Sequence, residues 1–507
     1  MSKHFRATRA IAALLAMILI VSCSKEDSGS GIVNPETVSK PDQVFYGLTA
    51  SNGLVRYNAN ASTTAQATIA ITGLPAGERI LAIDFRPATG QLYGLGSSNR
   101  LFVINHETGA AIAVGAGSFT PAISGTIAGF DFNPTVDRIR LVTSTGQNLR
   151  LHPETGLVAA VDVSLTAGPS VAAAAYTNSY AGAVSTVLYD IDINTGKLYR
   201  QDPPNNGVLV EIGSLETAGS GEGGFDISPD NKTALAVLNV GSGSSLFQIN
   251  LTTGKATALG NLSTNIVGIA IPVPPVGYAA DINGNLQIIN LSAPATPAVR
   301  TISGLQPGEV VLGLDMRPAT GQLYALGSSS RLYTINMASG AATAVSLAPF
   351  STLLSGTSFG FDFNPTVDRI RLVSNTGQNL RLHPVTGDIA AVDGSLNPGA
   401  PAVSAAAYTN NFSGATTTTL FVIDPMTDKL YTQVPPNNGT LVETGSLGID
   451  ITAENGFDIG GTSNRAWAIV TTSAGTKLFS INTTTGAATE SGSLPLGTRA
   501  FAVGLGF

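Results

Sequence analysis

Short apolar runs separated by glycine-containing or polar turns recur along most of the chain. Runs of five or six residues between such turns are typical of β-strands and are too short for most helices. The clearest group of four runs occupies residues 80–85, 91–96, 100–105 and 110–114, with turns at 87–90 and 106–109. Further groups begin near Ile127, Val171 and Gly223, and a group of three runs lies at 44–71. The pattern predicts an all-β chain made of four-stranded units.

A long segment of the first half recurs in the second half. Residues 129–142, GFDFNPTVDRIRLV, return unchanged as residues 360–373, which is 231 residues later. The same offset relates the segment RPATGQLY at 86–93 to its repeat at 317–324, and an offset of 232 relates PPNNG at 203–207 to 435–439. Self-similarity of this length indicates a repeat architecture. We therefore expect two tandem copies, at 44–273 and 276–507.

Four antiparallel strands per unit, repeated every 40 to 50 residues or so, are typical of β-propeller blades. The first unit of copy one lacks a strand, whereas the run at 266–271 has no partner strands of its own. Pairing the two would close a ring, and copy two offers the same pairing between 276–291 and 501–507. This predicts two tandem five-bladed β-propellers. The alternative is one continuous ten-bladed propeller, because Pro272–Pro275 is short enough for an ordinary strand connection.

The N-terminus has the features of a bacterial lipoprotein signal. Lys3, Arg6 and Arg9 precede an unbroken apolar run at 10–21, which is too short to cross a bilayer comfortably. Residues 20–23, IVSC, resemble a lipobox, in which the cysteine is lipidated before the signal is removed. We expect residues 1–22 to be a cleaved signal peptide. Residues 23–43, rich in Ser, Gly, Pro and charge, are then a lipidated flexible tether.

The charge and the cysteine content exclude several classes of function. Removal of residues 1–22 takes away three positive charges and no negative one, so the net charge falls from −7 to −10. Such a balance repels nucleic acid, and membrane contact should come through lipid on Cys23. Because Cys23 is the single cysteine, disulfides, thiolate metal sites and thiol redox chemistry are excluded.

The residues after Cys23 bear on localisation. Ser24 is not the aspartate associated with inner-membrane retention, and the segment SKED at 24–27 resembles a short signal for export to the outer face. We expect an outer membrane lipoprotein that faces the cell exterior. The alternative is that SKED is only a solvated part of the tether.

Aspartates recur at one position of the predicted innermost strands. They are Asp84, Asp131 and Asp226 in copy one and Asp315, Asp362 and Asp458 in copy two. Innermost strands of a propeller surround a channel, so the carboxylates could converge and bind a hard cation such as Ca²⁺, or supply the acid and nucleophile of a glycosidase. The favoured interpretation is structural, because Arg86, Arg138 and Arg140 are near enough in sequence to form buried ion pairs with them.

Other residue types offer weaker candidates. His152 and His383 occupy matching positions beside turns and are expected to cap backbone carbonyls. No two histidines have metal-ligand spacing, so a zinc site is not predicted. Neither a serine nucleophile motif nor a phosphate-binding loop is present. The chain has one tryptophan, Trp467, and few aromatic residues, which weakens a polysaccharide-binding function, although four tyrosines fall near strand ends: Tyr93, Tyr199, Tyr324 and Tyr431.

The repeated motifs also carry a family resemblance. The run GFDFNPTVDRIRLV, continued by TGQNLRLHP and preceded by RPATGQLY, resembles the bacterial domain of unknown function 4394, which occurs in exported proteins. The resemblance covers both copies almost completely, but it implies little about activity, because the family's function is not established. By analogy with the propeller fold, we expect a non-enzymatic, surface-exposed lipoprotein that binds an unknown protein or glycan on its ring faces, without a required cofactor. The alternative is a glycan-active hydrolase that uses the aspartates.

Overall fold

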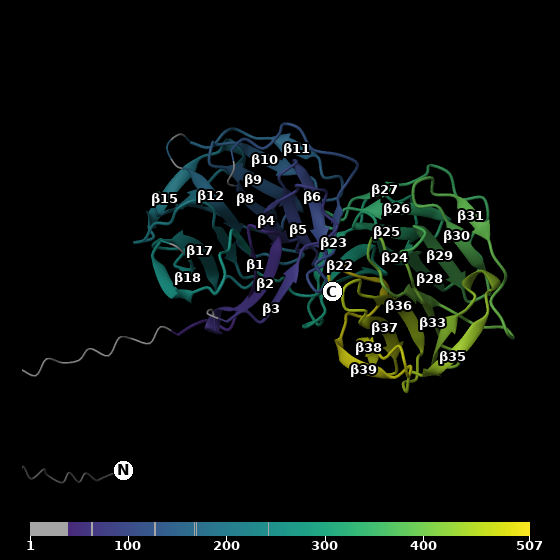
Figure 1. The fold of residues 1–507 in the computed structure, drawn as a ribbon. Coiled ribbons are helices and arrows are strands. Elements are labelled where there is room, and N and C mark those ends of the chain that lie inside the picture. The colour runs from purple at the N-terminus through teal and green to yellow at the C-terminus, as the bar shows by residue number, and fades with distance from the viewer. Residues whose placement is uncertain (1–38, 62–63, 126–127, 167, 169, 242) are drawn as a thin grey trace, which may run out of the picture. The chain divides into compact units, whose positions relative to one another are not determined.

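The computed structural model describes residues 39–507, apart from 62–63, 126–127, 167, 169 and 242 (Figure 1). The predicted signal peptide, Cys23 and the tether before residue 39 lie outside the described residues. Within the described part there is no α-helix, and the three 3-10 helices are η1 (Ala59–Ala61), η2 (Pro204–Asn206) and η3 (Pro436–Asn438). None of these described helices has the length and hydrophobicity that a membrane crossing requires. The all-β class is confirmed.

Copy one contributes the first twenty strands. They are β1 (Val44–Leu48), β2 (Gly53–Asn58), β3 (Ala67–Ala70), β4 (Ile80–Phe85), β5 (Leu92–Gly96), β6 (Arg100–Ile104), β7 (Ala111–Ala113), β8 (Ala128–Asn133), β9 (Arg138–Thr143), β10 (Asn148–Leu151), β11 (Val158–Val161), β12 (Val171–Tyr176), β13 (Leu188–Asp192), β14 (Lys197–Gln201), β15 (Leu209–Ser214), β16 (Gly224–Ile227), β17 (Ala234–Val240), β18 (Gly243–Ile249), β19 (Ala256–Asn261) and β20 (Gly268–Ala270).

Copy two repeats the series. Its strands are β21 (Val276–Asp281), β22 (Asn285–Asn290), β23 (Ala298–Thr301), β24 (Val311–Arg317), β25 (Gln322–Gly327), β26 (Arg331–Ile335), β27 (Ala342–Ala344), β28 (Phe359–Asn364), β29 (Arg369–Ser374), β30 (Asn379–Leu382), β31 (Ile389–Val392), β32 (Ala405–Tyr408), β33 (Leu420–Asp424), β34 (Lys429–Gln433), β35 (Leu441–Ser446), β36 (Ala453–Ile459), β37 (Ala466–Thr472), β38 (Gly475–Ile481), β39 (Ala488–Ser493) and β40 (Thr498–Val503).

The described strands form ten antiparallel sheets of four strands each, five in each copy. Burial falls from the first to the last strand of a sheet. The inner strand β12, VAAAAY, is buried at every position, whereas β15, the outer strand of the same sheet, has only partly buried and exposed positions. The outer strand of the preceding sheet, β11 (VAAV), alternates between partly buried and exposed residues. A continuous apolar run suits a strand covered on both faces, and alternation suits a strand with one face in solvent. The sequence therefore determines each strand's depth in its sheet.

Each copy is closed by a strand from its own end. β20 pairs with β1, so that Tyr46 lies opposite Ala270 and Leu48 lies opposite Gly268. β40 pairs with β21 in the same antiparallel sense. These are the two closing pairs that the sequence predicts. In copy one the innermost strands contact each other in the cycle β4, β8, β12, β16, β20 and back to β4, and in copy two the cycle is β24, β28, β32, β36, β40 and back to β24.

The long repeated motif contributes an arginine that joins neighbouring sheets. Arg140, on β9, is 2% exposed and donates hydrogen bonds to Asp162 at 2.6 Å, Asn148 at 2.7 Å and Asn205 at 2.7 Å. Asn205 lies in η2, which belongs to the PPNNG segment and follows the next sheet's third strand. Arg371 makes the equivalent bonds in copy two. Two of the repeated motifs are therefore one structural unit, because each supplies partners that keep the other's buried polar groups satisfied.

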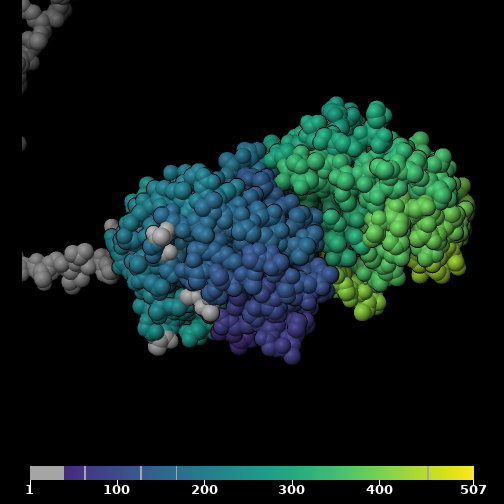
Figure 2. Space-filling view, turned by 90° about the horizontal axis from the view of Figure 1, so that it is seen from above, coloured from purple at the N-terminus to yellow at the C-terminus, as the bar shows by residue number. Residues whose placement is uncertain are grey.

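The two copies pack against each other within one compact unit, residues 40–507, and Figure 2 shows the blue and green copies in contact. The Tyr278 hydroxyl donates to the Ala88 carbonyl at 2.8 Å, and the Gly506 amide donates to the Thr89 carbonyl at 2.9 Å. Phe507 packs against apolar clusters of both copies and lies directly on Gly90. A Cβ at Gly90 would fall 2.1 Å from the Phe507 ring, so this close approach requires glycine.

Candidate functional site

The six predicted aspartates come together as two triads. Asp84, Asp131 and Asp226 form the copy-one triad, and Asp315, Asp362 and Asp458 form the copy-two triad. Within each triad one carboxylate oxygen of each residue lies within 4.8 Å of those of the other two, and no triad residue is more than 4% exposed. The inner strands β4, β8 and β16, with their copy-two equivalents, bring the triads together. The convergence that strand alternation suggested is present.

Each triad carboxylate accepts hydrogen bonds from the backbone of the inner strands. Asp84 accepts the Phe132 amide of β8 at 2.8 Å, and Asp131 accepts the Tyr176 amide of β12 at 3.0 Å. Asp226 accepts the Ile271 amide, just beyond β20, at 2.5 Å. The copy-two triad accepts the amides of Phe363, Tyr408 and Val503 in the same way. The carboxylates thus join three of the five neighbouring pairs of inner strands in each cycle, which in copy one are β4 with β8, β8 with β12, and β16 with β20.

The predicted ion pairs between these aspartates and the nearby arginines are wrong. The end of the strand does not decide this, because Arg317 is the last residue of β24 and binds Asp368 and not Asp315, whereas Arg86 lies just after the end of β4. Its guanidinium binds Asp137 instead. Arg140 reaches outward to Asp162, and Arg138 donates to the Asp137 carbonyl. The short aspartate side chains are satisfied by neighbouring backbone amides before any arginine comes within reach.

Without a cationic partner, the triads are driven toward protonation. Burial raises the pKa of Asp84 and Asp131 well above the usual range for aspartate, and the neighbouring triad carboxyls raise it further. Burial raises the pKa of Asp226, and of Asp458 in copy two, to about 7. A glycosidase needs carboxyls that reach a substrate bond. These carboxyls are buried between the inner strands, so the geometry favours a structural role for them over the alternative, a hydrolase.

A calcium ion would need more oxygen ligands than a triad displays. Ca²⁺ takes roughly six to eight oxygens, whereas each triad brings together one carboxylate oxygen from each of three residues. Among the described triad residues, only Asp362 has a buried carboxylate oxygen without a hydrogen-bond partner. The triads therefore fit shared protons better than a calcium ion.

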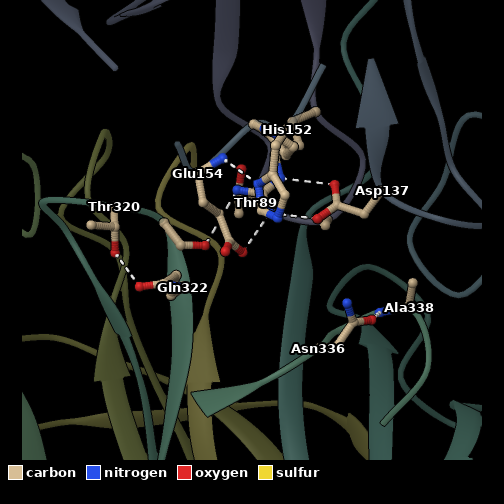
Figure 3. Close-up of polar contacts among 12 residues, drawn as sticks. Thr89, Asp137, His152, Glu154, Thr320, Gln322, Asn336 and Ala338 are labelled. Carbon is tan, nitrogen blue, oxygen red and sulfur yellow. Dashed lines mark hydrogen bonds and ion pairs between the residues drawn. The ribbon is translucent and has the colours of Figure 1, made fainter. Parts of the chain in front are cut away.

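A second group of charged residues lies where the two copies meet (Figure 3). Arg86 is fully buried and donates to Asp137 at 2.9 and 2.5 Å and to Glu154 at 3.2 Å. It also donates to the Gly321 carbonyl of copy two at 3.3 Å. In copy two, Arg317 binds Asp368 in the same way, but Val385 stands where copy one has Glu154. Glu154 is therefore an acidic residue of copy one, at the junction, that has no acidic counterpart in copy two.

The surroundings shift the protonation of this junction group. Burial and the positive charges of Arg138 and Arg86 lower the pKa of His152 to about 4, so its imidazole is neutral at neutral pH. Burial raises the pKa of Glu154, although Arg86 and a hydrogen bond from Gln322 of copy two oppose this. His152 accepts the Glu154 backbone amide at 3.3 Å through Nδ1, and His383 accepts the Val385 amide at 3.2 Å. The two histidines therefore cap amides, not the carbonyls that were expected.

Equivalent surfaces of the two copies line two separate cavities at the junction. The apolar cavity, about 390 Å³, lies between the sheet β4–β7 and loops of copy two, and its lining includes Val103, Ile112 and Phe412. The polar cavity, about 300 Å³, lies between the sheet β24–β27 and turns of copy one, and its lining includes Thr334 and Thr343. Thr334 and Thr343 occupy the positions that Val103 and Ile112 hold in copy one. The same surface of the repeat is therefore apolar at these two positions in copy one and carries hydroxyl groups there in copy two.

A third cavity, of about 900 Å³, contains the single tryptophan and is called the tryptophan cavity here. Trp467 lines it together with Phe85, His106 and Phe507, and the Arg465 guanidinium lies 5.4 Å from the Trp467 ring centre. His106, Thr462 and Gly506 line both this cavity and the apolar cavity. The two cavities therefore adjoin.

The residues of the junction were not predicted from the sequence, because the prediction was based on positions at which the two copies have the same residue. The positions that point to the junction are those at which the copies differ: His106 corresponds to Met337, and Trp467 corresponds to Leu235. Of the predicted tyrosines, Tyr93 lines the apolar cavity, but its hydroxyl and that of Tyr324 donate to proline carbonyls. Tyr199 and Tyr431 lie on β14 and β34, away from the three junction cavities.

Fold and cavities together define an all-β protein of two tandem copies, with its larger cavities at the copy junction. A family model described as a domain of unknown function, DUF4394, matches residues 53–270 and 285–504. The chain therefore belongs to the DUF4394 family, and the two matches confirm the duplication. No curated protein matches the chain.

Several solved structures show a distant likeness. The extracellular domain of a one-component system from B. thetaiotaomicron is 13% identical, with 88% of this chain and 58% of that chain covered and a TM-score of 0.24. Hydrazine synthase from Kuenenia stuttgartiensis is 11% identical, with 81% and 97% covered and a TM-score of 0.25. PorZ, a surface component of the type-IX secretion system of Porphyromonas gingivalis, is 13% identical, with 89% and 58% covered and a TM-score of 0.25. The chain thus spans 58% of the length of the first structure.

Proposed function

We propose that this chain is a non-enzymatic binding protein of the outer membrane, anchored through lipid on Cys23 and facing the cell exterior. Its ligand is a protein or a glycan of the cell envelope or its surroundings. It contains two tandem five-bladed β-propellers, and its ligand binds at the junction between them. Neither nucleic acid nor a cofactor takes part.

The propeller assignment is supported by strand pairing. In each copy the five innermost strands contact each other in a closed cycle, and the closing strand comes from the end of the same copy. A single ten-bladed ring would instead require β20 to contact the innermost strand of copy two. Two complete cycles of four-stranded antiparallel sheets favour separate rings.

The location of the cavities carries the binding proposal. The three cavities at the junction take residues from both copies, and two of them lie on equivalent surfaces of the repeat. Ligand sites occur preferentially at domain interfaces, in concave and largely apolar pockets with a few polar groups. The inner aspartates, by contrast, are buried and bonded to backbone amides. A binding role at the junction is therefore favoured over catalysis at the ring centres, and also over the ring faces expected from the sequence.

The single tryptophan allows a direct test. The full-length lipidated protein, in detergent, is titrated with separated protein and polysaccharide fractions of the cell envelope while Trp467 emission is recorded. We expect a saturable change with one of these fractions. The variant Ser413→Phe, which fills the apolar cavity, should weaken the response about tenfold.

The control is Thr252→Phe, an exposed position outside the three junction cavities. It should respond as the unmodified protein does. The absence of any saturable change, or equal affinity in the Ser413→Phe variant, would contradict binding at the junction.

A further inference from the structure

The polar cavity differs from its counterpart in copy one by a small set of side chains. Both cavities use the same positions of the repeat, including Asn336 and Ser339 in copy two where copy one has Asn105 and Thr108. The change from Val103 to Thr334 replaces an apolar side chain by a hydroxyl-bearing one of similar shape, and the change from Ile112 to Thr343 replaces an apolar side chain by a smaller, hydroxyl-bearing one. The sheet is unchanged, so the substitution alters what the surface can bind and not how it folds.

Two of the hydroxyls that line the polar cavity, those of Thr334 and Thr343, are not used by the protein, whereas the Ser339 hydroxyl donates to Asn336. Among the described residues, neither the Thr334 nor the Thr343 hydroxyl has a hydrogen-bond partner, although each lies on a strand where a valine or isoleucine is equally acceptable. Across the cavity, copy one contributes the Arg138 guanidinium, the neutral imidazole of His152 and the Glu154 carboxylate. Hydroxyl, guanidinium, imidazole and carboxylate groups together provide both donors and acceptors.

The cavity has no excess of charge. Two positive groups, Arg86 and Arg138, lie beside two negative groups, Asp137 and Glu154, and Arg86 is fully committed to those two acids and to Gly321. The His152 imidazole carries no charge at neutral pH. An anionic or cationic ligand would therefore gain little electrostatic energy here. A neutral ligand with several hydroxyls would match the cavity's donors and acceptors.

We propose that the polar cavity binds a neutral sugar residue. Its volume, about 300 Å³, is at the lower end of the range for small-ligand pockets and suits one or two sugar rings. The threonine hydroxyls and the Glu154, His152 and Arg138 side chains bond the sugar hydroxyls, while Met337 presents an apolar surface to the C–H groups of the ring. This inference rests on the proposed binding function and names the class of its ligand.

The test exchanges the two threonines for the residues that copy one carries. The full-length protein and the variant Thr334→Val/Thr343→Ile are mixed with glucose, galactose, mannose, N-acetylglucosamine and their common disaccharides, and binding is measured by saturation-transfer NMR and calorimetry. At least one of these sugars should bind the unmodified protein. The variant should bind it roughly tenfold more weakly or worse, because two hydrogen bonds are lost.

The matched control is Thr301→Val, an exposed strand threonine of copy two that lines none of the three junction cavities. It should bind the sugar normally. Equal binding by the double variant would overturn the assignment of the site. If none of these sugars binds while an envelope fraction still changes Trp467 emission, the ligand class is wrong and the proposed function stands. If neither response is seen, both proposals fail.

Discussion

Replacement of Arg86 by methionine should destabilise the protein far more than the same change at Arg317. The two arginines occupy equivalent positions and each binds the aspartate 51 residues later, at the same two distances within 0.1 Å. Their environments differ, because the Arg86 side chain is fully buried and that of Arg317 is 13% exposed. The Asp137 side chain is 8% exposed and that of Asp368 is 34% exposed. The pair of variants therefore compares a buried arginine that has two acidic partners with a partly exposed arginine that has one.

The expected loss of unfolding free energy depends on how deeply the carboxylates that lose their arginine partner are buried. Arg86→Met removes the cation between Asp137 and Glu154, which remain largely buried, so the free energy of unfolding should fall by about 3–5 kcal/mol. Arg317→Met leaves Asp368 partly in water, and the loss should be about 1 kcal/mol. Denaturant titration followed by circular dichroism measures both values. Equal losses for the two variants would refute this account of the junction.

A double-mutant comparison adds a control. In a background of Asp137→Asn, the further loss on Arg86→Met should be smaller than in the unmodified protein, because one of the two acids no longer requires a cation. An unchanged loss would mean that Arg86 acts through packing of its aliphatic part, and not through its charge.

The other predictions concern the anchor, the triads and the closure of each copy. Cys23→Ser should leave the protein unprocessed or release it into soluble fractions, which detergent partitioning detects; normal processing and fractionation would contradict lipidation. Folded Asp226 titrates at about 7 and unfolded aspartate near 3.8, so the folded state holds an extra proton between these values. Stability should therefore fall as pH rises from about 4 to about 7, and thermal melts should show a smaller slope for Asp226→Asn. Added Ca²⁺ should leave the melting temperature unchanged, whereas a rise that Asp131→Asn abolishes would establish a cation site. A chain of residues 44–273 should fold alone and melt cooperatively; aggregation would support the ten-bladed alternative.

Much of the fold could be predicted from periodicity alone. The strands could be recognised because a buried strand needs a continuous or alternating apolar pattern. The closing pairs could be recognised because the first unit of each copy lacked a strand, and the duplication because the same segments recur in the second half. The convergence of Asp84, Asp131 and Asp226 was also predictable, since they share one position of an inner strand. Their hydrogen-bond partners were not, because backbone amides of a neighbouring sheet leave no trace in the sequence.

The junction could not be predicted for a different reason. The repeated pattern does not distinguish the positions of Glu154, His106 and Trp467 from other turn and strand positions. The role of these residues depends on the packing of one copy against the other. Comparison of the copies position by position would have singled them out, because Val385, Met337 and Leu235 replace them. Such differences mark candidate positions, but only the packing shows that several of them share one junction.

The central claim is that ligand binds between the copies. Hydrogen–deuterium exchange of the full-length protein, with and without the envelope fraction that changes Trp467 emission, tests it most directly. Binding at the junction predicts slower exchange in peptides that cover residues 103–112, 334–343 and 412–414, while the outer strands β15 and β35 are unchanged. Slower exchange confined to segments outside the three junction cavities, with no change at these peptides, would contradict the claim.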